Sequence, residues 1–230
     1  LQRLAKQGHL AFDKIIVGIL CVGVREDKGR TYCSAVCCAE ALDCLVKVKE
    51  KYQDSQIYVL YQDMRLPVED WKFYRKAHEE GIIFIRYIPE KPPKISFVEN
   101  KPVISVDDIT IMVKLEISAD KVALAAPLIP RESNIELASM LKVSLNDQGF
   151  FLEAHPKLSP LDFATDGIHL CGTCHSPQDV AERVYQALGA ASRALIPLMK
   201  GKVISEAITA EVSPDLCVTC GNCEVVCEYS

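Results

Sequence analysis

The sequence lacks the features that would suit it to nucleic acid or to a membrane. It contains no run of lysines or other basic patch, and its formal net charge at pH 7 is −5. It therefore offers no cationic surface for a phosphate backbone. No apolar run reaches the length that a membrane-spanning helix requires. A signal peptide is also lacking, and we expect a cytoplasmic protein.

The sequence also lacks a GxGxxG fingerprint, the glycine-rich turn that binds the adenine end of a dinucleotide. It begins at Leu1 rather than at a methionine, and it ends three residues after its last cysteine. We therefore expect a fragment, or one piece of a split protein, whose missing front half carries the Rossmann motif. Its 230 residues, 49% of them hydrophobic, suffice for one large domain with a small appendage.

Cysteine, in contrast, is abundant, with 11 residues. Without a signal peptide, this number favours metal ligation over a disulfide framework. Cys21 follows an apolar run typical of a strand buried on both faces of a parallel sheet. Cys33 and Cys37 are spaced by one helical turn, with Cys38 beside them, where we expect a helix to begin. A helix N-terminus favours thiolates, and four converging thiolates match the ligand count of a [4Fe-4S] cluster.

Two alternatives for these cysteines remain open. Cys37, Cys38 and Cys44 are also compatible with small buried hydrophobic residues, as unpaired cysteines often are. Zinc is the other alternative, although vicinal cysteines strain a tetrahedral site more readily than a cluster with separate iron corners.

The runs 21–27 and 32–38 resemble the CxGSRD...YCSxVCC signature of the A-type subunit of heterodisulfide reductase, an iron-sulfur flavoprotein. The similarity continues through nearly the whole chain. It implies a thioredoxin-reductase-like flavin fold and ligand roles for Cys21, Cys33, Cys37 and Cys38 in a [4Fe-4S] cluster near FAD. It also implies an anaerobic host and, as partners, disulfide-reducing subunits, a hydrogenase or formate dehydrogenase module, and ferredoxin.

Strand and helix signals alternate over residues 14–87 and predict a βαβαβ unit with a parallel sheet. The expected strands are 14–21, 56–61 and 82–87, and the expected helices are 34–52 and 68–80. An antiparallel meander is expected at 94–98, 102–106 and 109–117, followed by a strand at 121–126 that returns to the sheet, a short helix at 136–141 and a short strand at 150–152. Asp63-Met64-Arg65 resembles the family's DIR element; the alternative is a plain polar loop.

The predicted fold class is accordingly α/β. We expect a Rossmann-like lobe carrying a cluster at 1–130, the C-terminal half of an FAD-binding lobe at 131–202, and a linker with a ferredoxin-like motif at 203–230. In the first lobe, Cys21-Val22-Gly23 stands in place of the glycine-rich nucleotide-binding turn. This lobe is therefore expected to have exchanged nucleotide binding for a cluster.

Residues 165–179 predict a strand that ends in a glycine turn and opens a long helix, an arrangement that presents backbone N–H groups to phosphate. The stretch resembles the second flavin-binding motif of the thioredoxin-reductase-like fold. The resemblance implies flavin contacts from Gly172, Thr173, Asp179, Val180 and, nearer the ring, Gln186.

Cys171 to His175 also spells CxxCH, the haem c attachment pattern. Attachment would require export and a loop able to wrap haem, so we expect two turn cysteines that contact a cofactor. A redox-active dithiol of Cys171 and Cys174 is the alternative. His169 alternates with apolar neighbours and is expected to pack in the core.

The run Cys217, Cys220, Cys223 and Cys227 has the spacing CxxCxxCxxxC, the strongest motif in the sequence. It predicts a second [4Fe-4S] cluster, which we expect to act as a surface-accessible relay after a linker. Glu228 replaces the usual proline and no second motif follows. Cys227 therefore either completes this cluster or serves a partner motif beyond the chain.

These features predict an oxidoreductase subunit that moves electrons between FAD and [4Fe-4S] clusters, and the resemblance adds flavin-based bifurcation. The alternative is a flavin-free relay or scaffold subunit, which the absent GxGxxG favours. The family pattern places a lysine facing the flavin where this chain has Asp43, and a carboxylate there would disfavour an anionic reduced flavin. The alternative is that Asp43 is a solvated helix residue beside Glu40.

Overall fold

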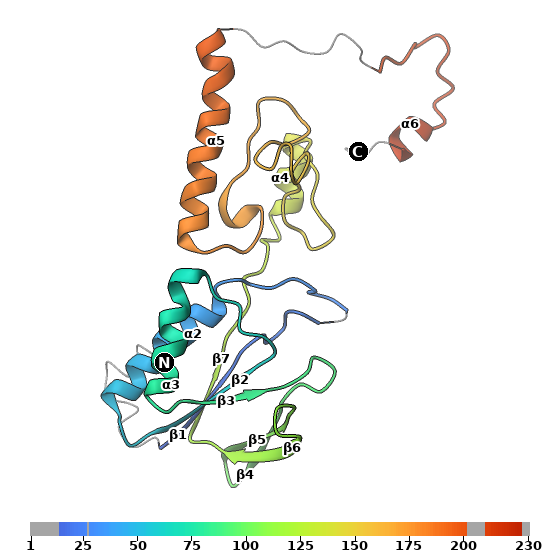
Figure 1. Cartoon of the computed structure of the whole chain (residues 1–230). Coiled ribbons are helices and arrows are strands. Elements are labelled where there is room, and N and C mark those ends of the chain that lie inside the picture. Colours follow the sequence, from blue (N-terminus) through green and yellow to red (C-terminus); the bar gives the residue numbers. More distant parts are fainter. Residues whose placement is uncertain (1–13, 27, 202–209, 227–230) are drawn as a thin grey trace. The chain divides into compact units, whose positions relative to one another are not determined.

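The computed structural model describes residues 14–26, 28–201 and 210–226, and the chain divides into two compact units, Leu1–Leu128 and Ile129–Ser230 (Figure 1). Unit 1 is built on a parallel sheet with the strand order β3-β2-β1-β7. Its strands are β1 (Ile15–Ile19), β2 (Gln56–Tyr61), β3 (Ile83–Arg86) and β7 (Lys121–Leu124). The predicted α/β fold with a parallel sheet is confirmed.

Two helices and a second sheet cover the opposite faces of this parallel sheet (Figure 1). The helices are α2 (Cys37–Lys51) and α3 (Trp71–Glu79), the latter preceded by the 3-10 turn η1 (Val68–Asp70). The second sheet is the antiparallel meander β4 (Lys94–Val98), β5 (Lys101–Asp108) and β6 (Val113–Ser118), in the order β4-β5-β6.

The side chains of β1 alternate between these two layers, as the pleat of a strand dictates. Ile16 packs into the cluster beneath the helices, whereas Val17 and Ile19 pack against the meander. Gly18 faces α2, and a Cβ at this position would lie 2.9 Å from Cδ1 of Leu45. The glycine therefore lets α2 approach β1 closely, just before the chain reaches the cysteines.

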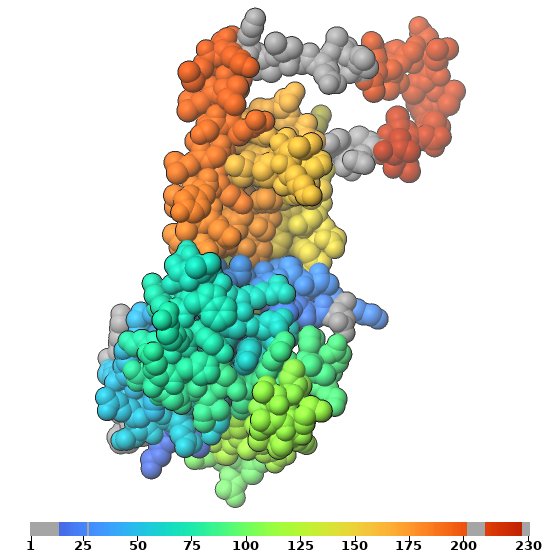
Figure 2. Space-filling view, viewed as in Figure 1, coloured from blue at the N-terminus to red at the C-terminus, as the bar shows by residue number. Residues whose placement is uncertain are grey.

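Unit 2 contains helices α4 (Asn134–Leu141), α5 (Val180–Lys200) and α6 (Asn222–Val225), and the 3-10 turn η2 (Gly172–Cys174). A small core of Val143, Phe151, Phe163 and Leu170 packs beside Ala138 of α4. Only one residue of α5, Ala190, is buried, and the helix presents its side chains at the surface along its length (Figure 2).

The strands expected at 150–152 and before residue 171 are not formed. Phe151 and His169 make single antiparallel bridges, to Leu145 and Asp162 respectively. A strand exists only where a neighbouring strand takes up its backbone hydrogen bonds. In the part of unit 2 that the structure describes, no neighbouring strand extends these bridges into a sheet.

None of the helices in the described part of the chain has the length and apolar character needed to span a bilayer.

Candidate iron-sulfur site

The loop between β1 and α2 turns back on itself and brings its two ends together. Cys21 and Arg25 both adopt the left-handed backbone conformation, each with φ of 59°. The Arg25 N–H donates to the Tyr32 carbonyl oxygen at 3.1 Å, which closes the loop. As a result Cys33, twelve residues after Cys21, returns to the same end of the sheet.

Two hydrogen bonds fasten this loop to the chain beyond β7. The Tyr32 hydroxyl donates to the carbonyl oxygen of Leu128 at 2.8 Å, and the Leu128 N–H donates to Oγ of Ser34 at 3.1 Å. Ser34 is almost fully buried. The segment that carries Cys33 is thus fixed against the parallel sheet.

Helix α2 begins at Cys37, later than expected, and Cys33 lies in the loop before it. Ala35 has φ of 59°, a left-handed conformation that cannot be part of a right-handed helix. The backbone N–H of Ala35 instead points to Sγ of Cys33 at 3.4 Å. The expectation that the helix begins at Ser34 is therefore wrong, because Ala35 interrupts it.

All four cysteines of this region lie close enough to influence one another. Cys21, Cys37 and Cys38 are buried, and Cys33 is half-buried. The pKa of Cys37 is raised by a hydrogen bond with Cys38, by burial, and by the charges of Cys38, Cys21 and Cys33. The convergence of a strand end, a loop and a helix N-terminus thus gathers four potential thiolates.

A hydrogen bond between Cys37 and Cys38 raises the pKa of the first thiol and lowers that of the second. The hydrogen bond from Cys37 lowers the pKa of Cys38 to about 7, with burial opposing the effect and the backbone N–H of Arg65 and the Arg25 charge supporting it. Burial raises the pKa of Cys21, although the backbone N–H of Gln62 and the Arg25 guanidinium counteract it. Cys38 is therefore the thiol most ready to bind a cation.

Within residues 14–26, 28–201 and 210–226, no three His, Cys, Asp or Glu side chains are arranged to hold one metal ion. An iron-sulfur cluster makes a different demand, since each thiolate binds its own iron corner and the sulfurs are spread around the cluster. Four cysteines with cationic and N–H neighbours provide the donor set for such a group. The site therefore fits a cluster in its chemistry.

The segment Asp63-Met64-Arg65 belongs to this site. The carbonyl oxygen of Asp63 lies 4.0 Å from Sγ of Cys38, and its carboxylate pairs with Arg25 and Arg86. The correspondence of this segment to the DIR element stays a prediction. Arg86 and Gln62 had no role in the sequence interpretation, because each becomes a neighbour of the cysteines only through the parallel pairing of β2 with β1 and β3.

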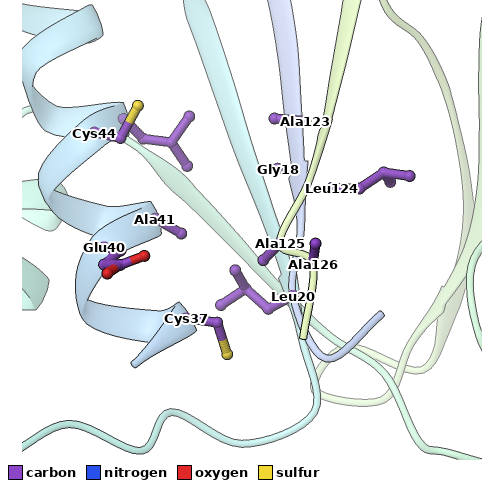
Figure 3. Close-up of a pocket in the computed structure, with 11 residues that line it drawn as sticks. Gly18, Leu20, Cys37, Glu40, Ala41, Cys44, Ala123, Leu124, Ala125 and Ala126 are labelled. Atoms are coloured by element: carbon purple, nitrogen blue, oxygen red, sulfur yellow. The ribbon is translucent and has the colours of Figure 1, made fainter. Parts of the chain in front are cut away.

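A cavity of about 340 Å³ adjoins the cysteines, between α2 and the ends of β1 and β7 (Figure 3). Cys37, Ala41 and Cys44 follow one another along α2 on its wall, with Leu20 opposite Cys37 (Figure 3). Its walls are largely apolar apart from Glu40. Cys44 therefore faces this cavity and is separate from the group of four.

The residues expected to contact a flavin lie at η2 and at the start of α5. The N–H of Gly172, which has φ of 75°, donates to Oε1 of Gln186 at 2.9 Å. The carboxylate of Asp179 caps α5 by accepting from the Glu182 N–H at 2.8 Å, and Val180 is exposed. The structure brings Gly172 and Gln186 together, with Thr173 exposed beside them.

The CxxCH stretch forms the turn η2 and its flanks, and both of its cysteines are free thiols. The Cys174 thiol donates to the carbonyl oxygen of Cys171 at 3.1 Å. The ring of His175 hydrogen-bonds to Glu153, with 2.9 Å between Nε2 and Oε2. His169 is partly buried and hydrogen-bonds to Asp162. Contact of the two turn cysteines with a cofactor stays a prediction, as does the alternative of a redox-active dithiol.

In the C-terminal segment, Cys217, Cys220 and Cys223 are all exposed. Gly221, with φ of 74°, precedes the short helix α6 and turns the chain between Cys220 and Cys223. Cys227 lies outside the described residues.

No family model matches the chain. Among curated proteins, the A-type iron-sulfur subunit of the CoB-CoM heterodisulfide reductase of Methanocaldococcus jannaschii is 38% identical over 218 residues, which cover 94% of this chain and 33% of that protein. The A-type subunit of the H(2):CoB-CoM heterodisulfide,ferredoxin reductase of Methanothermobacter thermautotrophicus is 35% identical over 222 residues, again 94% of this chain and 33% of the relative. Over this length the chain is similar to A-type heterodisulfide reductase subunits. The resemblance inferred from the cysteine motifs is confirmed, and the chain spans about a third of the length of these relatives.

A solved structure of known fold resembles this chain. The thioredoxin reductase of T. acidophilum superposes with a TM-score of 0.57 at 14% sequence identity, covering 85% of this chain and 56% of that protein. The expected thioredoxin-reductase-like fold is thereby confirmed.

Proposed function

We propose that this chain is the cluster-bearing part of an iron-sulfur flavoprotein subunit that transfers electrons within a heterodisulfide reductase-like complex. The observation that carries this proposal is the convergence of Cys21, Cys33, Cys37 and Cys38 at the carboxyl edge of a parallel sheet. Ligands bind at that edge in open α/β folds, and four thiolates are the ligand set of a [4Fe-4S] cluster.

A [4Fe-4S] cluster would supply one-electron transfer at this site. The four cysteines would hold it, and the buried side chains of Leu20, Cys37 and Cys38 would keep water from it. The backbone N–H groups of Ala35 and Gln62 would point the positive ends of their dipoles toward the sulfurs. Burial and N–H donors set the reduction potential of such a group.

We extend the proposal to a second [4Fe-4S] cluster bound by Cys217, Cys220 and Cys223, with Cys227 as the fourth ligand or as the ligand of a partner motif. The exposure of the first three cysteines supports a relay that meets other proteins. Electron transfer between proteins requires a donor near the surface.

The flavin is proposed to bind beside η2 and the N-terminus of α5, through Gly172, Thr173, Asp179, Val180 and Gln186. One solved structure of similar fold is a thioredoxin reductase. The relatives' names mention H(2), ferredoxin and the CoB-CoM heterodisulfide. Disulfide-reducing subunits, a hydrogenase or formate dehydrogenase module and ferredoxin are accordingly our proposed partners.

A flavin-free relay subunit is the second candidate, and one observation favours it. The Gly172 N–H and the Asp179 carboxylate are both engaged within the chain, by Gln186 and Glu182 respectively. A phosphate at this turn would have to displace the Gln186 amide from the Gly172 N–H.

Anaerobic purification with iron, sulfide and flavin quantified per chain tests both candidates. We expect about eight irons if both clusters are four-iron centres. A flavin absorption band in the chain, alone or with its neighbouring subunits, supports the flavoprotein, whereas iron without flavin in either preparation supports the relay. Absence of iron would overturn both.

A further inference from the structure

Arg25 occupies an unusual position for an arginine in a loop. Its backbone has φ of 59°, in the left-handed region that few residues other than glycine adopt. Its side chain is only 15% exposed. Nη1 lies 4.0 Å from Sγ of Cys21, at the limit of a hydrogen bond to sulfur. Such backbone conformations persist where the surrounding structure holds them, and they concentrate at functional sites.

A carboxylate holds the Arg25 guanidinium in this position. Nη2 of Arg25 lies 2.6 Å from Oδ2 of Asp63, and the other oxygen of Asp63 accepts from Nη2 of Arg86 at 2.8 Å. Arg86 is held in turn, because its Nε donates to the carbonyl oxygen of Gln62 at 2.9 Å. Two guanidinium groups therefore surround one carboxylate. The network carries a net positive charge next to the cysteines.

The groups that face the cysteines from other elements add to this charge. Arg65 follows β2, and its charge acts on Cys38 together with that of Arg25. Tyr87, after β3, donates its hydroxyl to the carbonyl oxygen of Leu20 at 2.7 Å, next to Cys21. Asp63 is the carboxylate that pairs with Arg25. Cations thus outnumber the single carboxylate among these groups, and Arg25 is the guanidinium that contacts a sulfur.

We propose that Arg25 is a positioning and redox-tuning residue, held by Asp63 against the Cys21 sulfur so that its charge stabilises the reduced state of a cluster on the four cysteines. This inference rests on the proposed function, because it requires that cluster. Reduction adds one electron to a group already negative from its thiolates, and a nearby cation lowers the free energy of the reduced form. The reduction potential is thereby raised.

The test uses the full chain with Cys220→Ala and Cys223→Ala, so that the cluster on Cys21, Cys33, Cys37 and Cys38 is measured alone. Iron is quantified, and the midpoint potential is measured by an anaerobic titration followed by electron paramagnetic resonance. We expect Arg25→Gln to retain iron and to have a more negative midpoint potential. A tenfold weaker reduction equilibrium would correspond to a shift of about 59 mV for one electron.

Two further variants separate tuning from a merely structural role. Arg25→Lys keeps the charge and should restore a potential near that of the parent. Asp63→Asn removes the opposing charge but leaves an amide oxygen that can still accept from the Arg25 guanidinium, so the potential should shift in the positive direction, opposite to Arg25→Gln. The matched control is Arg30→Gln, which removes the same charge from an exposed position of the same loop and should change the potential least.

An unchanged potential in an iron-loaded Arg25→Gln variant would overturn the inference. If that variant fails to fold or loses iron, Asp63→Asn decides: a positive shift, or a negative shift caused by release of the guanidinium, supports the inference, and a potential unchanged from that of the parent overturns it. A parent chain without iron would overturn both the proposed function and this inference. If the parent binds the cluster but its midpoint potential is the same in all variants, this inference alone is overturned.

Discussion

Asp43 and Lys47 form an ion pair across one turn of α2, with 2.6 Å between Oδ2 and Nζ. Asp43 is half-buried and Lys47 is exposed. The carboxylate is therefore partly neutralised by its own helix, and position 43 is neither a bare anion nor a freely solvated residue. The family pattern has a lysine at this position. Any influence of Asp43 on a flavin would therefore be that of an ion-paired carboxylate.

Asp43→Lys should shift the one-electron potentials of a bound flavin. A lysine stabilises an anionic reduced ring, whereas the native carboxylate disfavours it, and we hypothesise that the native flavin transfers electrons without bifurcating. The new lysine also lies one turn before Lys47, and such a like-charge pair costs only about 0.2–0.5 kcal/mol of helix stability. Redox titration of the flavin in both proteins is the measurement. Asp43→Asn controls for loss of the ion pair, and identical potentials in all three proteins would show that position 43 is silent.

Cys33→Ala should remove about four irons per chain and leave the C-terminal cluster intact. The reason is that Cys33 contributes the thiolate of the loop, while Cys21, Cys37 and Cys38 come from the strand end and the helix. Iron and sulfide analysis of the anaerobically purified variant provides the measurement. Cys44→Ala is the matched control, because Cys44 lines the adjacent cavity on the same helix, and it should retain all iron. Full iron content in Cys33→Ala would contradict the ligand assignment.

Removal of residues 214–230 should abolish electron transfer to at least one partner while the first cluster stays in place. Cys217, Cys220 and Cys223 are exposed, and a relay must approach the surface of the next protein. Reduction of the first cluster by dithionite, followed spectroscopically, checks that it is intact. If electron transfer to every partner survived the deletion, these cysteines would not form a relay.

The sequence was informative where a pattern is local. The apolar run of β1 predicted a buried parallel strand because both of its faces are covered, by Leu45 on one side and the meander on the other. The prediction from sequence failed at Ala35. The left-handed backbone of this residue delays the start of α2, and no helix propensity indicates it in advance. The strand expected before residue 171 failed for another reason, since pairing depends on a neighbour distant in sequence.

The electrostatic surroundings of the cysteines were the least predictable part of the site. Arg25 and Asp63 are 38 residues apart, and only the pairing of β1 with β2 brings them together. The family signature includes Arg25, but a sequence motif does not show which residues the Arg25 side chain contacts. Spacing could therefore predict which cysteines converge, but the carboxylate that holds the arginine had to come from the structure.

Asp120 links the first strand of the sheet to the meander, and its replacement should destabilise unit 1 in a pH-dependent way. Its Oδ2 accepts from the N–H groups of Lys14 and Ile15 at 2.9 and 3.0 Å, and its Oδ1 pairs with Lys101 at 3.2 Å. The hydrogen bond from Ile15 is the main cause that lowers the pKa of Asp120, with Lys14 and Lys101 supporting it against burial.

Because the folded-state pKa of Asp120 lies below its unfolded value, its contribution is complete above the unfolded pKa of about 3.9 and is lost as pH falls through the folded pKa. Asp120→Asn should therefore lower the free energy of unfolding by about 1 kcal/mol at pH 6. The difference from wild type should shrink below about pH 4.

Trp71, the single tryptophan, lies in α3 of unit 1, so urea unfolding followed by its fluorescence reports on this unit. Asp107→Asn, which removes a carboxylate paired with Lys91 at 3.5 Å on the exposed meander, should have little effect at either pH. A pH-independent loss in Asp120→Asn would show that the residue acts through packing rather than through its charge.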